Sequence, residues 1–585
     1  MTDAARERRR DALAAGALWL GLSALFWLGR SRSFGPGDSP QHVLSALLWG
    51  VPQAPGYPLQ VELGWLWSRL PWADPGAAVN GLSGLLAAAA AAVLYLLLRR
   101  AKCRRAAALT GAALMALSPL FWYYSLVAEV RALNDLLALG GAYFAADWAR
   151  EGRARSLWAF AAVFGLGVSH HPTYVLLIPA YAVWLFARRV PPRRLAAAAA
   201  ISLAALAAPY LLLGLRLARS TPAYDLPDAR GWSGLLGLFL RENLGGPLRA
   251  VSGAGFFGFG GFDLRRLAVQ TGWFLSALWT HAGPAGLLLG ALGAAALWKT
   301  DRRSLLAWAL WAAVSAGVFI LISSQQITIC HPDYARAVVT RFYLLPMIAL
   351  FALSGHGAEA LAARVRPLFA WALAAAVLVL PLSLRPLSLA RSNGLLDYAR
   401  ALVADAKPGD MIVLAADDSI FATLDLELAR GEGGDRVFLT PSMFSYPPYI
   451  RSLHRRYPGL RVPPAGPRGL TTDWTVWRRL NPGRAVLMEP SLLDTALALY
   501  PRSVPQGTLI RIETRPPRDD PAADARRFLS EPATWSLTRW DVRPWTQEIY
   551  VLSARRRQAE WIGSRLNPRR DRALIARLKV LLAAL

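Results

Sequence analysis

The sequence predicts an α-helical polytopic membrane protein of about eleven transmembrane helices, followed by an extracytoplasmic α/β domain. The chain of 585 residues is 55% hydrophobic, with a mean hydropathy of +0.31. Apolar runs recur along its first two thirds, and each is close to the roughly 20 residues that cross a bilayer. From about residue 386 these runs give way to alternating strand-like and helix-like segments.

The N-terminal segment MTDAARERRRDALAAGALWLGLSALFWLG has a basic flank and then an apolar run, as a signal sequence does. The following RSRSFGP lacks a small-x-small cleavage site. We therefore expect an uncleaved first span with its basic N-terminus in the cytoplasm.

The basic loops RRAKCRR, RRVPPRR and KTDRR then all fall on the cytoplasmic side, as the positive-inside rule requires. The segment 267–283 is expected to be an interfacial helix, and the path of residues 215–282 stays open. The predicted spans cover about residues 11–29, 78–98, 106–122, 133–149, 156–169, 172–187, 195–214, 287–298, 304–322, 341–353 and 368–384. The transmembrane domain would comprise residues 1–385, and the C-terminus would lie outside.

Residues 386–585 are expected to form the extracytoplasmic α/β domain, ending in helices. The stretch KPGDMIVLAADDSIFATLDLELARG predicts a strand, a turn and a helix, and DRVFLTP and RAVLMEP predict further strands. The tail DRALIARLKVLLAAL predicts an amphipathic helix.

The net charge of +27 does not indicate nucleic-acid binding, because much of the Arg and Lys lies in short clusters between apolar runs and no RNA- or DNA-binding module is present. The two cysteines, Cys103 and Cys330, fall on opposite sides of the membrane and cannot pair. No Cys/His spacing predicts a zinc site.

The stretch GDSPQHVLSALLWGVPQAPGYPL, residues 37–59, follows the first span. Asp38 there could act as a general base on an acceptor hydroxyl, bind a divalent cation, or cap a helix that has Pro40 in its first turn. The prolines of QAPGYPL exclude a continuous helix. Tyr57 would sit on a rigid turn, either stacking on a sugar or steering a lipid, or anchoring at the interface.

A second acidic motif, FWYYSLVAEVRALND, follows the third span and contains Glu129, Arg131 and Asn134. Ionisable groups at this depth usually face a cavity or pair together. Two residues that are two positions apart on a helix do not face each other, so a Glu129–Arg131 pair explains little, and snorkelling to the surface is the alternative. The adjacent His170 and His171 of GVSHHPTY favour hydrogen bonding to a phosphate or carboxylate over a two-His metal site, with an interfacial role as the alternative.

Two arginines, Arg336 and Arg341, occur in CHPDYARAVVTRFYLLP at the outer face, where the positive-inside rule gives no reason for them. The planar guanidinium makes paired, charge-assisted hydrogen bonds to phosphate. We therefore expect a phosphate-binding role for Arg341.

These motifs resemble those of the bacterial protein O-mannosyltransferase-like family (domain of unknown function 2723), which belongs to the glycosyltransferase-C superfamily. The matching segments are Asp38-Ser39, QAPGYPL, VNGLSG, AEVRALN, GLGVSHHPTY and RFYLLP. The later MIVLAADDSIFATLDLELA resembles the outer domain of longer members. The chain departs from the family pattern at Gln53-Ala54, at Arg131 (where the family has tyrosine) and at Ala416-Asp417-Asp418-Ser419.

The resemblance implies a glycosyltransferase-C-like membrane enzyme that moves a sugar, mannose or another hexose, from a polyprenyl-phosphate donor to a protein or glycan hydroxyl. Transfer would take place at the outer face of the bacterial cytoplasmic membrane, with inversion. It assigns general-base catalysis to Asp38 and a positioning role to Glu129. Donor phosphate would be bound by Arg341, Arg336, His170 and His171, and substrate by His42, Tyr57, Asn80 and Asn134. The resemblance makes no cofactor certain, and a divalent cation stays open.

Two other functions compete with this one. A lipid or glycan transporter is disfavoured because the sequence shows no inverted repeat and no matched pair of broken helices. A non-catalytic surface scaffold or receptor stays open because of the departures at Gln53 and Arg131.

Overall fold

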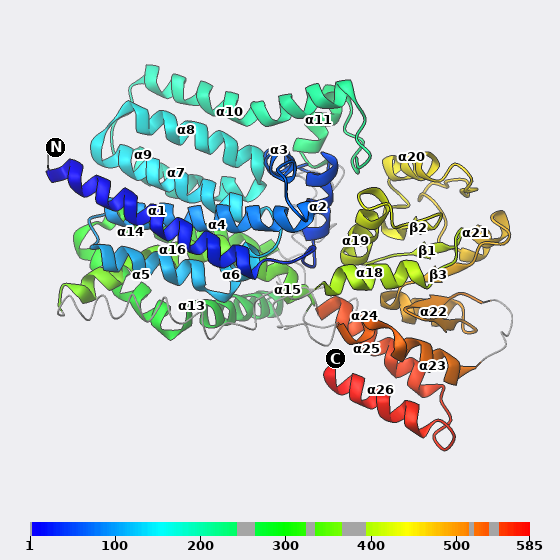
Figure 1. The fold of residues 1–585 in the computed structure, drawn as a ribbon. Coiled ribbons are helices and arrows are strands. Elements are labelled where there is room, and N and C mark those ends of the chain that lie inside the picture. Colours follow the sequence, from blue (N-terminus) through cyan, green and yellow to red (C-terminus); the bar gives the residue numbers. More distant parts are fainter. Residues whose placement is uncertain (1–2, 243–263, 323–333, 365–392, 514–519, 537–548) are drawn as a thin grey trace.

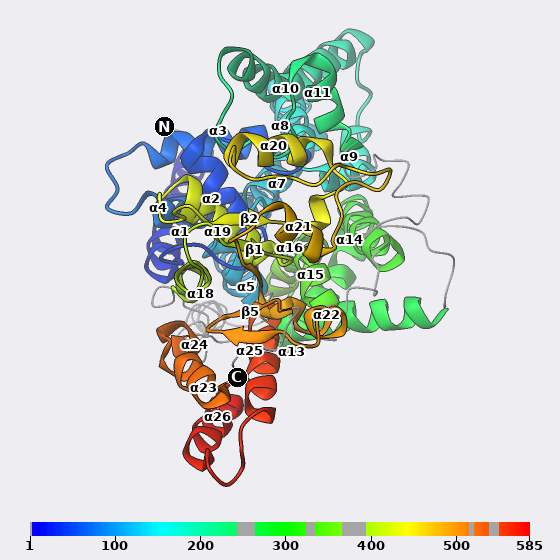
Figure 2. The same ribbon diagram turned by 90° about the vertical axis from the view of Figure 1, so that its right-hand side faces the viewer.

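A computed structural model describes residues 3–242, 264–322, 334–364, 393–513, 520–536 and 549–585. Long helices form a bundle, and a smaller unit with a β-sheet lies at one end of it (Figures 1 and 2). The chain's N-terminus is at the opposite end of the bundle from this unit (Figure 1).

The bundle contains most of the predicted membrane spans. Its elements are α1 (Asp3–Gly29), α4 (Pro75–Arg100), α5 (Arg105–Leu117), α6 (Pro119–Ser125), α7 (Arg131–Glu151), α8 (Ala154–His170), η1 (Pro172–Leu177), α9 (Ile178–Leu185), α10 (Pro192–Arg219), α13 (Leu264–Thr300), α14 (Arg302–Ile322) and α16 (Leu344–Ala362). Ten of the eleven predicted spans coincide with these helices, some of them with broken pairs. The eleventh, about residues 368–384, lies outside the described residues, as does Cys330.

The length and composition of the described helices support fewer complete spans than the eleven predicted. Six are long and apolar enough to cross a membrane, or seven if α5 and α6, bent by 65°, count as one span. The α8 helix, for example, has only 17 residues. The expected interfacial helix is the first half of α13, which breaks at Gly283.

Shorter elements gather at the end of the bundle that faces the sheet (Figure 1). They are α2 (Ser39–Leu48), α3 (Pro58–Ser68), α11 (Gly231–Phe239), α15 (Tyr334–Thr340) and η3 (Arg341–Tyr343). The proline-rich stretch between α2 and α3 is non-helical, as predicted, because proline removes a backbone donor and clashes with the preceding turn.

The C-terminal part builds a five-stranded mixed sheet in the order β2-β1-β3-β5-β4. Strands β2 and β3 flank β1 in parallel, with Met411 opposite both Val437 and Val486, and β5 pairs antiparallel with β3 and β4. The elements are α18 (Gly394–Ala404), β1 (Met411–Val413), α19 (Asp417–Leu428), β2 (Val437–Leu439), η5 (Pro441–Met443), α20 (Pro447–Arg456), α21 (Trp474–Leu480), β3 (Val486–Met488), η6 (Pro490–Leu492), α22 (Leu493–Leu499), β4 (Val504–Gln506), β5 (Leu509–Arg511), α23 (Pro521–Ser530), α24 (Pro532–Ser536), α25 (Ile549–Ser564) and α26 (Arg572–Ala584). The strand–turn–helix predicted around β1 and α19, the strands β2 and β3 and the terminal helix α26 are confirmed.

The sheet unit and the bundle end share one hydrophobic core. Val43 and Leu44 of α2 are fully buried in the same cluster as Ile412 of β1 and Phe421 of α19. Burial of apolar area stabilises by roughly 25 cal/mol per Å², so this shared core holds α2 against α19. The chain segments directly before and after α2 are thereby held close to the C-terminal unit.

Close packing in the bundle depends on two glycines. Helices α13 and α16 approach so closely that a Cβ on Gly293 would collide with the Leu353 carbonyl, and one on Gly357 with the Leu289 carbonyl. Gly272, also on α13, has open space around it.

We expect Gly293→Ala to lower the stability of the purified protein by about 1–3 kcal/mol, the usual range for overpacking. Gly272→Ala is the matched control and should be neutral or slightly stabilising, because alanine is the better helix former. Thermal unfolding in detergent compares the two variants. An equal effect of both would contradict the close approach of α13 and α16.

Candidate active site

Asp38, between α1 and α2, makes an ion pair with Arg341 of η3. Its Oδ2 lies 2.8 Å from Arg341 Nη1, and its Oδ1 accepts a long hydrogen bond of 3.5 Å from Gln53 Nε2. Asp38 precedes α2 at the N-cap position, but its side chain makes no capping hydrogen bond. The helix-cap interpretation of this carboxylate is therefore wrong, and its charge is directed at Arg341.

Glu129 is the second carboxylate on the same guanidinium. Its Oε1 is 3.7 Å from Arg341 Nη1, and only 1% of its side chain is exposed. It lies in the break between α6 and α7, so it does not share a helix with Arg131, the first residue of α7. Both are buried, which excludes snorkelling to the surface.

The environment separates the proton affinities of the two acids. Burial by itself raises the pKa of Asp38. Interactions with Arg341, His42 and Arg131 together lower it by more than burial raises it, so the pKa ends below its ordinary value. For Glu129, burial and then repulsion from Asp38 raise the pKa to about 7, although Arg341 and Arg131 oppose this. Asp38 is therefore the ionised member of the pair, and Glu129 keeps its proton up to about neutral pH.

Tyr57 is at the centre of a ring cluster with three histidines. Its ring centroid is 5.4 Å from that of His42, 6.2 Å from His170 and 5.9 Å from His171. Tyr57 is buried, so it is not an interfacial anchor.

The histidines of this cluster connect it to the rest of the site. His170 Nε2 donates to the Val130 carbonyl at 2.9 Å, which connects the cluster to the segment that carries Glu129. Burial lowers the pKa of His42 to about 4, against the pull of Asp38, so His42 is neutral at pH 7.

Arg131 belongs to the site, although the sequence analysis did not place it there. Its guanidinium lies 4.5 Å from the Phe342 ring centroid, and its Nη1 is 3.5 Å from His171 Nε2. The side chain is buried, and within the described chain its Nε has no hydrogen-bond partner. The available signal was an arginine two residues after Glu129, at the position where the resembling family has tyrosine.

Arg131 and Arg341 line one small cavity. Asn134, Asp135 and Thr173 supply its other polar groups, and Phe342 is part of its apolar wall. Arg341 Nε and Asn134 Oδ1 are buried without a partner among the residues that the structure describes. Two cations and unpaired polar atoms on one wall favour contact with an anionic group, although the cavity is too narrow as it stands to admit a water molecule.

Asn80 lies behind the site. Its Nδ2 donates to the carbonyls of Ser31 and Ser33, at 3.1 and 2.8 Å, and its Oδ1 accepts from Ala128 N at 2.7 Å. The side chain is fully buried. Asn80 therefore joins the loop after α1 to the segment before Glu129, where the sequence analysis expected a contact with substrate.

Arg336 is directed elsewhere than expected. Its Nη2 donates to Ser276 Oγ of α13 at 2.8 Å. The structure thus places it with α13, while Arg341, one and a half turns further on, reaches Asp38.

The C-terminal unit reaches this site through the first residues of α19. Asp418 Oδ1 accepts a hydrogen bond from Gly37 N, directly before Asp38. Asp417, the first residue of α19, has an exposed side chain. The sequence analysis assigned neither residue to the site.

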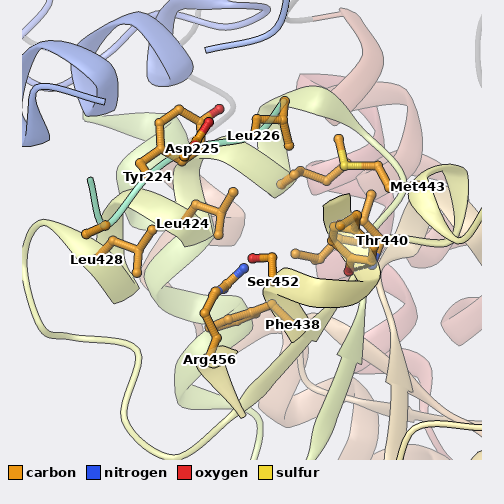
Figure 3. Close-up of a pocket in the computed structure, with 14 residues that line it drawn as sticks. Tyr224, Asp225, Leu226, Leu424, Leu428, Phe438, Thr440, Met443, Ser452 and Arg456 are labelled. Carbon is orange, nitrogen blue, oxygen red and sulfur yellow. Dashed lines mark hydrogen bonds between the residues drawn. The ribbon is translucent and has the colours of Figure 1, made fainter. Parts of the chain in front are cut away.

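A separate cavity lies where the segment 223–226 crosses the C-terminal sheet unit (Figure 3). Tyr224 lines it and receives a hydrogen bond of 3.0 Å from Gln41 Nε2 of α2. Arg456 and Ser452 of α20 lie on its other side (Figure 3). None of the predicted site residues lines this cavity.

No group of three or more His, Cys, Asp or Glu side chains within the described ranges is placed to hold a metal ion. The cation alternative for Asp38 receives no support from these neighbours, because its nearest charged partner is itself a cation.

Comparisons by sequence and by structure each find known proteins that are similar to this chain. The family model for the protein O-mannosyl-transferase TMEM260 N-terminal domain matches residues 38–193. Protein O-mannosyl-transferase TMEM260 of Mus musculus is 25% identical over 476 residues, which cover 76% of this chain and 65% of that protein. Its Dictyostelium discoideum counterpart is 24% identical over 373 residues, or 59% of this chain and 44% of that protein. The chain thus spans less than two thirds of either relative.

Among solved structures, ArnT from Cupriavidus metallidurans, bound to undecaprenyl phosphate, superposes with a TM-score of 0.52 at 12% identity. The match covers 86% of this chain and 99% of ArnT. The chain is thus similar in sequence to protein O-mannosyl-transferase TMEM260 over part of its length, and it shares the fold of ArnT. The resemblance predicted from the sequence is confirmed by these matches, and the apolar helices together with the ArnT-like fold indicate a multi-pass membrane protein.

The proton on Glu129 can be observed directly. At about pH 6, below the pKa of about 7, infrared difference spectroscopy should show a buried protonated carboxyl whose band is lost in Glu129→Gln. In Asp38→Asn the band should titrate at lower pH, because the repulsion is removed and Arg341 is left to Glu129 alone. A titration that moves to higher pH in Asp38→Asn would contradict the assignment.

Proposed function

We propose that this protein transfers a sugar, mannose or another hexose, from a polyprenyl-phosphate donor to an acceptor hydroxyl of a protein or glycan. The observation that carries the proposal is the Asp38–Arg341 ion pair, with Glu129 on the same guanidinium, at one end of a membrane bundle. The names of the relatives support mannose and a protein acceptor. The undecaprenyl phosphate bound to ArnT supports the lipid carrier.

In the proposed reaction Asp38 accepts the proton of the acceptor hydroxyl as its oxygen attacks the anomeric carbon. The new carbon–oxygen bond forms while the bond from the anomeric carbon to the phosphate oxygen breaks, and polyprenyl phosphate leaves. A single displacement inverts the configuration at that carbon. The ionised state of Asp38 fits a base, because a protonated carboxyl could not take the proton.

The leaving phosphate would be stabilised by Arg341 and Arg131. Arg341 holds Asp38 through Nη1 while its Nε stays unpaired, so it can bind an anion without releasing the base. Arg131 faces the same cavity, and fixed donors aimed at developing charge lower the barrier. Glu129, with its proton, would donate a hydrogen bond to donor or acceptor. Asn134 and Thr173, which line the same cavity, would contact the sugar once the cavity opens.

The proposal places the reaction at the outer face of the bacterial cytoplasmic membrane. The basic loops that set this orientation lie at the end of the bundle with the N-terminus, and Asp38 lies at the other end, beside the C-terminal unit (Figure 1). The lipid carrier keeps the donor phosphate at the bilayer edge, where this site is. In this arrangement residues 386–585 form the extracytoplasmic domain.

We expect Asp38→Asn to reduce sugar transfer by about 10²–10⁴-fold, the usual contribution of a general base. The assay uses purified protein, radiolabelled polyprenyl-phosphate mannose and a membrane extract as acceptor source. Asp74→Asn is the matched control, because Asp74 caps α4 through Ala77 N and asparagine caps equally well. Equal transfer by Asp38→Asn and wild type would remove Asp38 from catalysis. Absence of wild-type transfer with a panel of polyprenyl-phosphate sugars would overturn the enzyme proposal and favour a scaffold.

A second prediction concerns the phosphate. Arg131→Ala should weaken binding of undecaprenyl phosphate by about 10- to 100-fold, as expected from the loss of a charge-assisted hydrogen bond, and Arg131→Lys should restore part of it. Arg336→Ala should change the affinity little, because Arg336 is directed at Ser276. The measurement is lipid-binding affinity in detergent. If Arg336→Ala weakens binding more than Arg131→Ala does, the phosphate-binding role belongs to Arg336 and not to Arg131.

A further inference from the structure

The loop that carries Asp38 is held from the C-terminal unit. Gly37 has a left-handed backbone with φ of 74°, and its N–H donates to Asp418 Oδ1 of α19, 381 residues away in the chain. Asp418 is only 2% exposed. The bond is therefore shielded from water, where a charged acceptor interacts strongly with an N–H group.

An acidic residue in the first turn of a helix ordinarily stabilises the helix dipole and its free N–H groups. At the start of α19 another carboxylate already accepts hydrogen bonds from backbone N–H groups. Glu489, at the end of β3, accepts from Ala415 N and Ala416 N at 2.7 and 2.8 Å. Asp418 directs its Oδ1 out of its own helix, to Gly37, so the helix terminus alone does not explain it.

The position of Asp418 is itself fixed relative to the site. Helix α19 packs against α2 in the shared core, with Phe421 and Leu44 among the buried residues, and α2 begins at Ser39, directly after Asp38. The C-terminal unit therefore holds both neighbours of Asp38: Gly37 through a hydrogen bond and Ser39 through the helix that it starts.

We propose that Asp418 is a positioning residue for the reaction: by fixing Gly37, it sets the direction in which the Asp38 carboxylate approaches Arg341 and the acceptor. The inference rests on the proposed function, because it assigns Asp418 a part in the transfer that Asp38 would catalyse. It also makes the C-terminal unit a component of the active site. A displacement of about 1 Å at a catalytic group can lower the rate about 10²-fold.

The kinetic test compares three variants in the mannose-transfer assay. Asp418→Ala should lower kcat by about 10- to 100-fold with little change in KM for the lipid donor, whose phosphate site it does not touch. Asp418→Asn keeps an oxygen that can accept from Gly37 N and should restore most of the rate. Asp425→Asn is the control: Asp425 is a buried carboxylate of the same helix, paired with Arg430 at 2.6 Å, and its loss should leave kcat near wild type.

A second measurement does not depend on activity. Hydrogen–deuterium exchange at the Gly37 amide should accelerate in Asp418→Ala, but not in Asp418→Asn or Asp425→Asn. If exchange changes as expected while wild type transfers no sugar, the transferase proposal fails and the catalytic part of this inference fails with it. If wild type transfers sugar while Asp418→Ala leaves both exchange and kcat unchanged, or Asp425→Asn lowers kcat as much, the positioning role is overturned.

Discussion

One guanidinium shared by two carboxylates, the buried Glu129 and the partly buried Asp38, is the constraint around which this end of the molecule is organised. A charge removed from water is strongly destabilising unless it is paired, and Arg341 meets this requirement by contacting Asp38 and Glu129. The three residues come from three separate segments: the loop after α1, the break between α6 and α7, and η3. Displacing either Asp38 or Arg341 would leave the charge of the other unpaired, so this ion pair fixes how the loop after α1 meets η3.

The supporting contacts follow from this requirement. Asn80 joins the first two segments through three hydrogen bonds. The hydrogen bond from His170 to the Val130 carbonyl connects the ring cluster of Tyr57 to the residue beside Glu129. Arg341 is the one residue of the described chain that makes an ion pair with either acid, so the two acids are not both stabilised as anions, and the closer one, Asp38, remains ionised. The same geometry thus gives both a stable fold and two carboxyl groups in different protonation states, as acid–base chemistry requires.

The sequence was sufficient for features that depend on local pattern. Apolar runs located ten spans that coincide with helices or broken helix pairs of the structure, and the strand–turn–helix around β1 and α19 followed from hydrophobic periodicity. Asp38, Glu129 and Arg341 could be singled out because ionisable residues at membrane depth are energetically costly, so their presence indicates a functional or pairing role. Arg131 was missed because its relation to Glu129 was judged by helical geometry, whereas α7 begins only at Arg131. The contact of Arg336 with Ser276, and the inward role of Asn80, depend on packing between helices that no local pattern encodes.

The link between Asp418 and Gly37 is the extreme case of this limit. No periodicity relates two residues 381 positions apart, and Asp418 on its own has the appearance of an ordinary acidic residue at a helix start. Only the three-dimensional arrangement shows that Glu489 already serves the start of that helix and that the carboxylate is directed at another segment. Since α2 and α19 also share a core, the C-terminal unit cannot move relative to the bundle without moving the backbone on both sides of Asp38. A unit that the sequence suggests is a separate domain is thus mechanically part of the site.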